Sequence, residues 1–372
     1  MPRIFLGNFD FEYELAGTPT SREIPKLADI NRRLSLAWAP LLQPGDLVAH
    51  SDSSGTLQFH DPADPQTRIS PNPATSWELV PWGWSSSAHC LANSLAISIE
   101  GPDPEIVRKV NRRSFRFQLE CELGLALPGA ALIQSQQDLR AALAHIPPEV
   151  GWGLKSEFGM SGRERHLGRG PQISPVGLNW VASQLQAGMP LVFEPWLRSL
   201  REAGLLFEIP RRDPPLLSGI AELLTSSGGA YLGSRFGAVE DSRGWEPAID
   251  VGMQIAERLQ RLGYFGPLGI DAMIYETLEG SSRIRILQDL NARLTMGRLA
   301  LAWIPLLSHD ECGLWLHFKQ PPPESIVNSS DWPTTARVVR QSDFGTESWG
   351  WMLIAAANAE QRRQAETVLK GI

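Results

Sequence analysis

The stretch Gly269–Arg293, GIDAMIYETLEGSSRIRILQDLNAR, decides the expected fold because it contains two apolar segments suited to paired strands. Side chains alternate between the two faces of a strand, so Asp289 and Asn291 share one face of the second strand. On the first strand, Asp271 points away from the apolar face for the same reason. If the strands pair as a hairpin roughly 4.8 Å apart, two carboxylates and an amide converge.

Such oxygen donors suit a hard divalent cation. Mg²⁺ commonly binds one or two protein carboxylates and completes its shell with water and substrate phosphates. Without a cation, two close carboxylates repel each other and resist ionisation. The segment therefore predicts a magnesium site. The alternative is a purely structural pair of aspartates at strand ends, satisfied by turns or by nearby arginines: Arg283, Arg285 and Arg293.

A second informative segment, Gly151–Gly170, is locally basic in an acidic chain. Lys155 follows an apolar strand-like run, and Gly159, Ser161 and Gly162 come shortly after it. Glycines let backbone N–H groups approach phosphate oxygens, and basic side chains offset their charge. Because the lysine precedes the glycines, this is not the P-loop pattern. The segment suits polyphosphate binding, with a solvated loop as the alternative.

The third segment is LVFEPWLRSLREAGLLFEI, Leu191–Ile209. Glu194 ends an apolar strand, and Trp196 and Leu197 follow in a short apolar linker. Such a linker can sandwich a planar base while its backbone hydrogen-bonds the edge of the base. Glu202 lies where a carboxylate could accept hydroxyl protons from a sugar. The alternative is a plain connection between strands with a solvated glutamate.

The order of these segments resembles the ATP-grasp superfamily, in particular its carboxylate–amine ligases. The resemblance covers roughly Val107–Leu299, and it implies a mixed α/β and α+β fold. An N-terminal α/β domain would precede two α+β subdomains that clasp ATP. We expect the N-terminal domain at residues 1–105, the lid subdomain at 106–192 and the subdomain with the magnesium site at 193–372.

The resemblance also implies roles for individual residues. Lys155 would contact the α- and β-phosphates, the loop Gly159–Gly162 with Ser161 would close over them, and Arg113 would be a further phosphate contact. Glu194, Trp196 and Leu197 would hold adenine through backbone groups. The remaining expected roles are Glu202 on ribose, Arg293 facing the transferring group, and Asp271, Asp289 and Asn291 on Mg²⁺.

Composition restricts the class of protein. The 372 residues include 34 basic and 41 acidic side chains, a net charge of −7, which argues against a non-specific nucleic-acid binder. The three cysteines form no Cys-x-x-Cys pair, so neither a zinc ribbon nor a disulfide framework is supported. The longest apolar run is about half of the roughly 20 residues that a membrane helix needs. With no signal-peptide pattern at the start, we expect a cytoplasmic protein that does not bind membranes.

Two secondary-structure expectations matter below. The basic stretch Pro104–Leu123 predicts one helix that ends at Gly124, with its basic residues mostly on a solvated face. Residues Asp61–Ser76 are rich in Pro, Asp and Ser and predict a surface loop. Ser135 with Asp138 predicts a capping box at the start of another helix.

These features predict an ATP- and Mg²⁺-dependent ligase that joins a small-molecule carboxylate to an amine through an acyl phosphate. A second hypothesis is a non-catalytic nucleotide-binding protein, because Asp289 stands where the family commonly has the longer Glu. A third is an aromatic-lined ligand-binding protein without nucleotide, suggested by the 13 tryptophans. Of these, we expect Trp82, Trp84, Trp349 and Trp351 to pack in the core and between lobes, with the lining of a substrate cleft as the alternative. The sequence leaves the oligomeric state open, a homodimer included.

Overall fold

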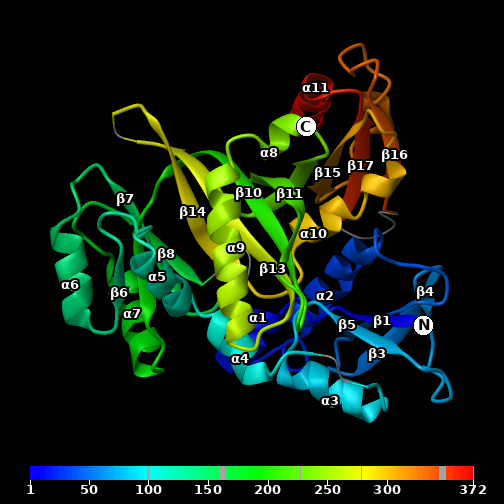
Figure 1. Cartoon of the computed structure of the whole chain (residues 1–372), viewed down its shortest axis with the longest axis horizontal. Helices are drawn as coiled ribbons and strands as arrows, with labels where there is room; N and C mark the ends of the chain where they lie inside the picture. Colours follow the sequence, from blue (N-terminus) through cyan, green and yellow to red (C-terminus); the bar gives the residue numbers. More distant parts are fainter. Residues whose placement is uncertain (99–100, 160–163, 227, 278, 343–348, 372) are drawn as a thin grey trace.

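The computed structural model describes residues 1–98, 101–159, 164–226, 228–277, 279–342 and 349–371. Its strands form three separate sheets, which Figure 1 shows as an N-terminal layer, a small lid and a large sheet. Helices and strands mix in all three parts, so the expected α/β and α+β class is confirmed.

The N-terminal sheet consists of β1 (Arg3–Leu6), β2 (Leu47–Ser51), β3 (Leu57–Asp61), β4 (Asp64–Arg68) and β5 (Glu78–Pro81). Its order is β4-β3-β2-β1-β5, and β1 pairs in parallel with both β2 and β5. The helices are α1 (Phe11–Ala16), α2 (Pro25–Leu34) and α3 (Ser86–Ser94), with the 3-10 helix η1 (Ser35–Trp38). The expected loop at Asp61–Ser76 is partly wrong, because β4 lies within it. A polar edge strand forms through backbone hydrogen bonds to one neighbouring strand. It therefore needs no apolar pattern by which the sequence could predict it.

The lid consists of β6 (Ala131–Ile133), β7 (Gly151–Ser156), β8 (Arg165–Arg169) and β9 (Leu191–Pro195), in the order β6-β9-β7-β8. Its helices are α6 (Gln136–Ala144) and α7 (Pro175–Gln186), and α5 (Arg113–Glu122) packs against β9. The capping box of α6 is confirmed. The Ser135 amide donates to Asp138 at 2.8 Å, and the Asp138 amide donates to the Ser135 hydroxyl at 3.2 Å.

The single helix expected at Pro104–Leu123 is wrong. The structure has α4 (Pro104–Val110) and then α5, with Arg112 in an extended conformation between them. The side-chain oxygen of Asn111 accepts a hydrogen bond from the Ala292 amide at 2.9 Å, and its Nδ2 donates to the Val107 carbonyl. An asparagine that binds backbone groups in this way competes with helical hydrogen bonds. The break therefore depends on a distant strand end.

The large sheet contains β10 (Arg198–Ile209), β11 (Leu216–Thr225), β12 (Tyr231–Phe236), β13 (Gly266–Glu276), β14 (Ser282–Asn291), β15 (Cys312–Phe318), β16 (Arg337–Gln341) and β17 (Gly350–Ala356). All neighbours in its order, β14-β13-β10-β11-β12-β15-β17-β16, are antiparallel. The helices of this part are α8 (Val239–Ser242), α9 (Glu246–Arg261), α10 (Met296–Leu301) and α11 (Ala359–Lys370), with the 3-10 helices η2 (Ile304–Leu306) and η3 (Glu324–Ile326). The hairpin expected at Gly269–Arg293 is thus confirmed as β13 and β14.

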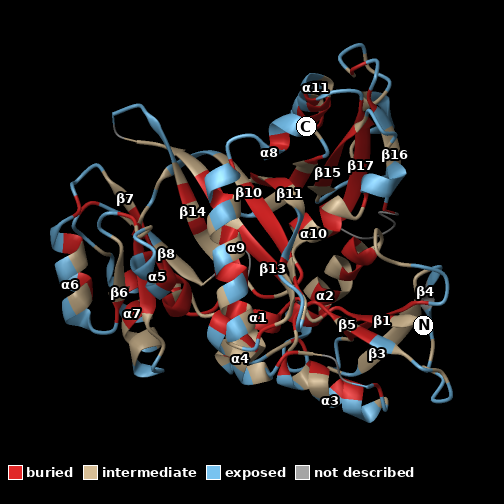
Figure 2. Ribbon diagram, in the orientation of Figure 1, coloured by how far each residue is buried: buried red, intermediate tan, exposed pale blue. Residues whose placement is uncertain are grey.

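The largest hydrophobic core joins the N-terminal layer to the large sheet, and Figure 2 shows buried strands in both. Trp38 from η1 and Trp315 from β15 are completely buried in it. The indole N–H of Trp351 donates to the Leu36 carbonyl at 3.0 Å across the same boundary. The expected packing role of Trp82 and Trp351 is confirmed. This core fixes how the two layers face each other around the cavity described next.

Within the described residues, no helix combines the length and the apolar character required to cross a membrane.

Candidate functional site

A cavity of about 720 Å³ lies between the lid, the large sheet and the N-terminal layer. This volume falls within the range of small-molecule pockets, about 300–1,000 Å³. Every described residue of the predicted site lines it: Arg113, Lys155, Gly159, Glu194, Trp196, Leu197, Glu202, Asp271, Asp289, Asn291 and Arg293. The predicted residues Ser161 and Gly162 lie outside the described residues. The fold therefore gathers side chains from three distant segments at one place.

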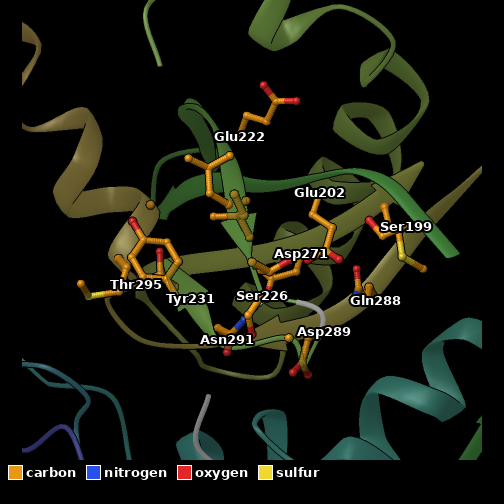
Figure 3. A pocket seen from close by; sticks show the side chains of 18 of the residues that line it. Ser199, Glu202, Glu222, Ser226, Tyr231, Asp271, Gln288, Asp289, Asn291 and Thr295 are labelled. Carbon is orange, nitrogen blue, oxygen red and sulfur yellow. Dashed lines mark hydrogen bonds between the residues drawn. The ribbon is translucent and has the colours of Figure 1, made fainter. Parts of the chain in front are cut away.

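The acidic cluster, defined here as Asp271, Asp289 and Asn291, lies at one end of the β13–β14 hairpin. Asp271 pairs directly with Asp289 across the two strands, and Gly269 pairs with Asn291. The Asn291 side-chain amide donates to Asp271 Oδ2 at 3.2 Å. Figure 3 shows the three side chains together in the cavity. The convergence predicted from strand alternation is confirmed.

The two carboxylates differ in their tendency to ionise. Burial and then the charge of Asp289 raise the pKa of Asp271 to about 7. Burial also opposes ionisation of Asp289, but the positive charges of Arg113 and Lys155 outweigh it and lower the pKa of that carboxyl. Asp271 therefore faces an ionised acidic neighbour, whose repulsion the charge of Arg293 only partly offsets. A divalent cation between them would remove this repulsion.

Among the described residues, no group of three or more His, Cys, Asp or Glu side chains forms a complete metal site. The acidic cluster instead offers two carboxylates and the amide oxygen of Asn291, which also accepts a hydrogen bond from Arg293; all three are hard donors. This set fits Mg²⁺, which commonly takes only one or two carboxylates and leaves positions for substrate phosphate and water.

Two basic side chains, Arg113 and Lys155, face the acidic cluster, and we call them the cationic wall. Arg113, at the start of α5, holds its guanidinium 3.8 Å from Asp289 Oδ2. The same guanidinium donates to the Ser156 carbonyl at 2.7 Å and to the Gly159 carbonyl at 3.2 Å, which ties α5 to the end of β7. Lys155 on β7 places its ammonium 2.8 Å from Glu194 Oε2. The wall therefore belongs mainly to the lid, opposite the carboxylates of the large sheet.

Glu194 has a partner set that sequence reasoning missed. Its carboxylate is 2% exposed and accepts a hydrogen bond from Arg116 at 2.6 Å. Arg285 on β14 also donates to it and bridges to Glu120 at 3.2 Å. These charges hold the pKa of Glu194 well below its usual range despite its burial. Arg116 is thus buried, which corrects the expectation of a solvated helix face; its i, i+4 spacing from Glu120 was the available signal.

The linker after Glu194 connects β9 to β10 as expected. The Trp196 amide donates to the Gly151 carbonyl at 2.8 Å, and its ring is 38% exposed in the cavity. The Arg165 guanidinium lies 5.2 Å from the centre of that ring. Leu197, the next residue of this apolar linker, also lines the cavity. A planar ligand group could therefore reach an aromatic surface here.

Glu202 on β10 lies close to the acidic cluster. It pairs with Met273 of β13, and its negative charge contributes to the raised pKa of Asp271. Figure 3 shows its side chain beside Asp271. Its predicted contact with ribose stays a prediction.

Arg293 lies where β14 leaves the sheet. Its guanidinium donates to Glu12 Oε1 at 2.6 Å and to Asn291 Oδ1 at 3.1 Å, and it lies 5.2 Å from the centre of the Trp82 ring. Glu12, on α1, is another residue that sequence reasoning missed. No local pattern near the start of the chain connects it with a strand 281 residues later.

No family model matches the sequence, and no curated protein is significantly similar to it. Solved structures, however, match along almost the whole chain. An N5-carboxyaminoimidazole ribonucleotide synthetase in an ADP complex is 14% identical with a TM-score of 0.54, over 98% of this chain and 95% of that chain. The same enzyme from Thermus thermophilus is 14% identical with a TM-score of 0.52, over 100% of this chain and 97% of that chain.

A third similar structure is the biotin carboxylase domain dimer of 2-oxoglutarate carboxylase from Hydrogenobacter thermophilus, in complex with MgADP, ADP and bicarbonate. It is 10% identical with a TM-score of 0.58, over 99% of this chain and 89% of that chain. At such low identities the similarity concerns the fold and not the substrate. Together with the three-sheet architecture, it shows that this chain has the ATP-grasp fold.

Proposed function

We propose that this protein is an ATP-dependent ligase that joins a carboxylate to an amine through an acyl phosphate. One observation carries the proposal: the acidic cluster and the cationic wall face each other across a single cavity. Phosphate groups need both kinds of partner, because their own charge requires cations and a bound metal requires carboxylates. The nucleotide complexes of the structural neighbours support it at the level of the fold.

In this proposal the triphosphate lies between Arg113 and Lys155 on the lid and the acidic cluster on the large sheet. Asp271, Asp289 and Asn291 would hold Mg²⁺, which would neutralise charge on the phosphate oxygens when bound. The adenine would lie along Trp196 and Leu197. We also propose the division into parts at residues 1–105, 106–192 and 193–372.

The chemistry needs no covalent bond to the protein. A carboxylate oxygen of the substrate attacks the γ-phosphorus, the bond to ADP breaks, and an acyl phosphate forms. The amine nitrogen then attacks the acyl carbon, phosphate leaves, and the nitrogen loses a proton to solvent. Arg293 offers a positive charge beside the acidic cluster, and the main contribution of the site is positioning and charge neutralisation.

A nucleotide-binding protein without catalysis is the second candidate. The observation that favours it is the ion pair of Lys155 with Glu194 at 2.8 Å. The Lys155 ammonium, which we expect to contact the phosphates, is thus already paired with a carboxylate. Burial also lowers the pKa of Lys155. In the ligase, nucleotide would have to share this ammonium with Glu194.

The test is a coupled assay of ADP release with a panel of carboxylates and amines. We expect Asp289→Ala and Lys155→Ala each to lower the rate by roughly 10²-fold or more, because each removes a charge at the phosphates. Asp331→Ala and Lys319→Ala, exposed residues outside the cavity, are the matched controls and should keep full activity. Full turnover in both site variants would exclude the ligase mechanism. Mg²⁺-dependent protection by ATP against heating, without ADP release across the panel, would favour the non-catalytic candidate.

A further inference from the structure

Part of the cavity lining has no role in the nucleotide position that we propose. Six side chains of the N-terminal layer and of the large sheet in this lining are apolar, aromatic or imidazole, beside charged residues such as Glu222, Arg235 and Lys370: Phe9, Leu34, Trp82, Tyr231, His317 and Trp349. Figure 3 shows Tyr231 and Ser199 on opposite sides of the acidic cluster. Since Ser199 follows the linker at Trp196, Tyr231 lies across the cluster from the start of β10 in this view. We call these six residues the aromatic end.

His317 lies among three rings in this end. The centre of its ring is 5.3 Å from that of Tyr231, 4.4 Å from that of Trp315 and 5.0 Å from that of Trp349, all edge-to-face. Its Nε2 is buried and has no hydrogen-bond partner within the described part of the chain. Burial lowers the pKa of His317 to about 3, so the ring is neutral at physiological pH. A buried polar atom without a partner is unfavourable unless a ligand supplies one.

Cations that line the cavity beside these residues are already paired with carboxylates, as Arg293 beside Trp82 is with Glu12. Arg235 donates to Glu366 at 2.6 Å, and Lys370 lies 2.7 Å from the same carboxylate. Arg235 also contacts Glu222 at 3.2 Å. A ligand with its own phosphate would have to compete with these carboxylates for positive charge.

Glu12 connects the aromatic end to the reaction centre. Its carboxylate is 7% exposed, and Oε1 accepts from Arg293. Its Oε2 is buried with no hydrogen-bond partner among the residues that the structure describes. Arg293 is also 5.2 Å from the Trp82 ring, so Glu12 and Trp82 have this guanidinium as a common neighbour. Its free oxygen could accept a hydrogen bond from an amine.

We infer that the aromatic end binds the acceptor substrate, an amine carried on an aromatic or heteroaromatic ring without a phosphate group. The amine donates to Glu12 Oε2, the ring packs against Trp349 and Tyr231, and a polar ring atom bonds to His317 Nε2. This inference rests on the proposed function, because it assigns the acceptor of that ligase. It adds a substrate class and a role for the aromatic side chains that line the cavity.

The test measures binding separately from turnover, by calorimetric titration of the full chain with and without saturating Mg²⁺ and ADP. The probes are 2-phenylethylamine, its matched non-aromatic analogue 2-cyclohexylethylamine, histamine, and 5-aminoimidazole ribonucleotide as a phosphorylated heteroaromatic amine. Aromatic pairs contribute roughly as much as a tenfold change in affinity beyond simple burial, so the two aromatic amines should bind about tenfold tighter than the cyclohexyl analogue. They should also bind tighter than the ribonucleotide.

Single substitutions test whether Trp349 causes the preference for aromatic amines. Trp349→Leu should abolish the preference for aromatic amines, while Trp349→Phe should keep most of it because a ring remains. Trp77→Leu, at a partly buried tryptophan of the N-terminal layer outside the cavity, should leave it unchanged. Circular dichroism shows whether each variant is folded.

Several outcomes would overturn the inference. These are equal affinity for the phenyl and cyclohexyl amines, tightest binding of the phosphorylated amine, binding of none of the four probes, or a preference that survives Trp349→Leu. Aromatic preference in the binding assay with no ADP release from any pair would instead refute the ligase and the acceptor role. The aromatic end itself would then remain supported as a binding site for an aromatic amine.

Discussion

Replacing Asp271 with asparagine should stabilise the metal-free protein at neutral pH. The pKa of Asp271 is about 7 in the folded state, against an ordinary value of 3.8, because burial and Asp289 oppose ionisation. Between these two values the native protein holds a proton that the unfolded chain has lost. The free energy of unfolding of the wild type therefore falls as pH rises from about 4 to about 7. Asparagine cannot ionise, so the free energy of unfolding of the variant should not fall over this pH range.

The difference between the two pKa values sets the magnitude. About three pH units at 1.36 kcal/mol each correspond to at most about 4 kcal/mol. Asp271 also lines the cavity, where water can reach part of the side chain, so we expect a gain of about 2–4 kcal/mol for the variant at neutral pH. Near pH 4 both proteins should have nearly the same stability, since both side chains are then neutral.

The assay is urea-induced unfolding in the presence of EDTA at a series of pH values from about 4.5 to about 7.5. The free energy of unfolding of Asp271→Asn minus that of the wild type should rise across this range. Asp331→Asn, at an exposed position, is the control, and its difference should stay flat. A flat difference for Asp271→Asn, or a difference that falls with pH, would refute the reasoning about the acidic cluster.

Magnesium should offset this effect. A ligand that binds only the native state stabilises it, by about 2.7 kcal/mol at a concentration of 100 times Kd. Because the metal needs an ionised carboxylate, the wild type should gain this stability progressively as pH rises toward and past about 7. Asp271→Asn should gain little at any pH. Equal stabilisation of both proteins by Mg²⁺ would show that the cation binds elsewhere.

Two further predictions concern stability. Arg285→Met should lower the free energy of unfolding by about 3–5 kcal/mol, because it leaves the buried carboxylates of Glu194 and Glu120 with fewer cations. Urea-induced unfolding measures this loss. A loss below about 1 kcal/mol would contradict a tightly coupled network. Gly168→Ala should destabilise the lid by about 1–3 kcal/mol, because the added Cβ would lie 2.1 Å from the buried Trp152 ring. Hydrogen exchange in β7 and β8 should then speed up, and unchanged exchange would show that the ring shifts freely.

Local sequence patterns predicted those parts of the fold that depend on near neighbours. The β13–β14 hairpin followed from strand alternation, and the start of α6 followed from Ser135 and Asp138 three residues apart. The acidic cluster was predictable for the same reason, since its residues occupy facing positions on adjacent strands. The break before α5 was not predictable, because Asn111 finds its partner at Ala292, 181 residues away.

The resemblance to the ATP-grasp superfamily predicted parts of the site that the periodicity of the sequence could not. It predicted that Arg113, Lys155 and Glu194 share a site with the acidic cluster, and the structure places them around one cavity. It did not predict the partners of Glu194 in its buried network, because Arg116 and Arg285 lie far from Glu194 in the sequence.

By itself, the sequence determined the alternation of strands, the helix caps and the acidic positions, all of which depend on residues a few places apart. Only the tertiary structure decided which charges became partners over long separations, such as Arg116 with Glu194 and Arg293 with Glu12. It also decided that His317 lies among rings in the lining of the cavity. The physical reason is that burial makes an unpaired charge costly, so packing between distant segments selects the partners.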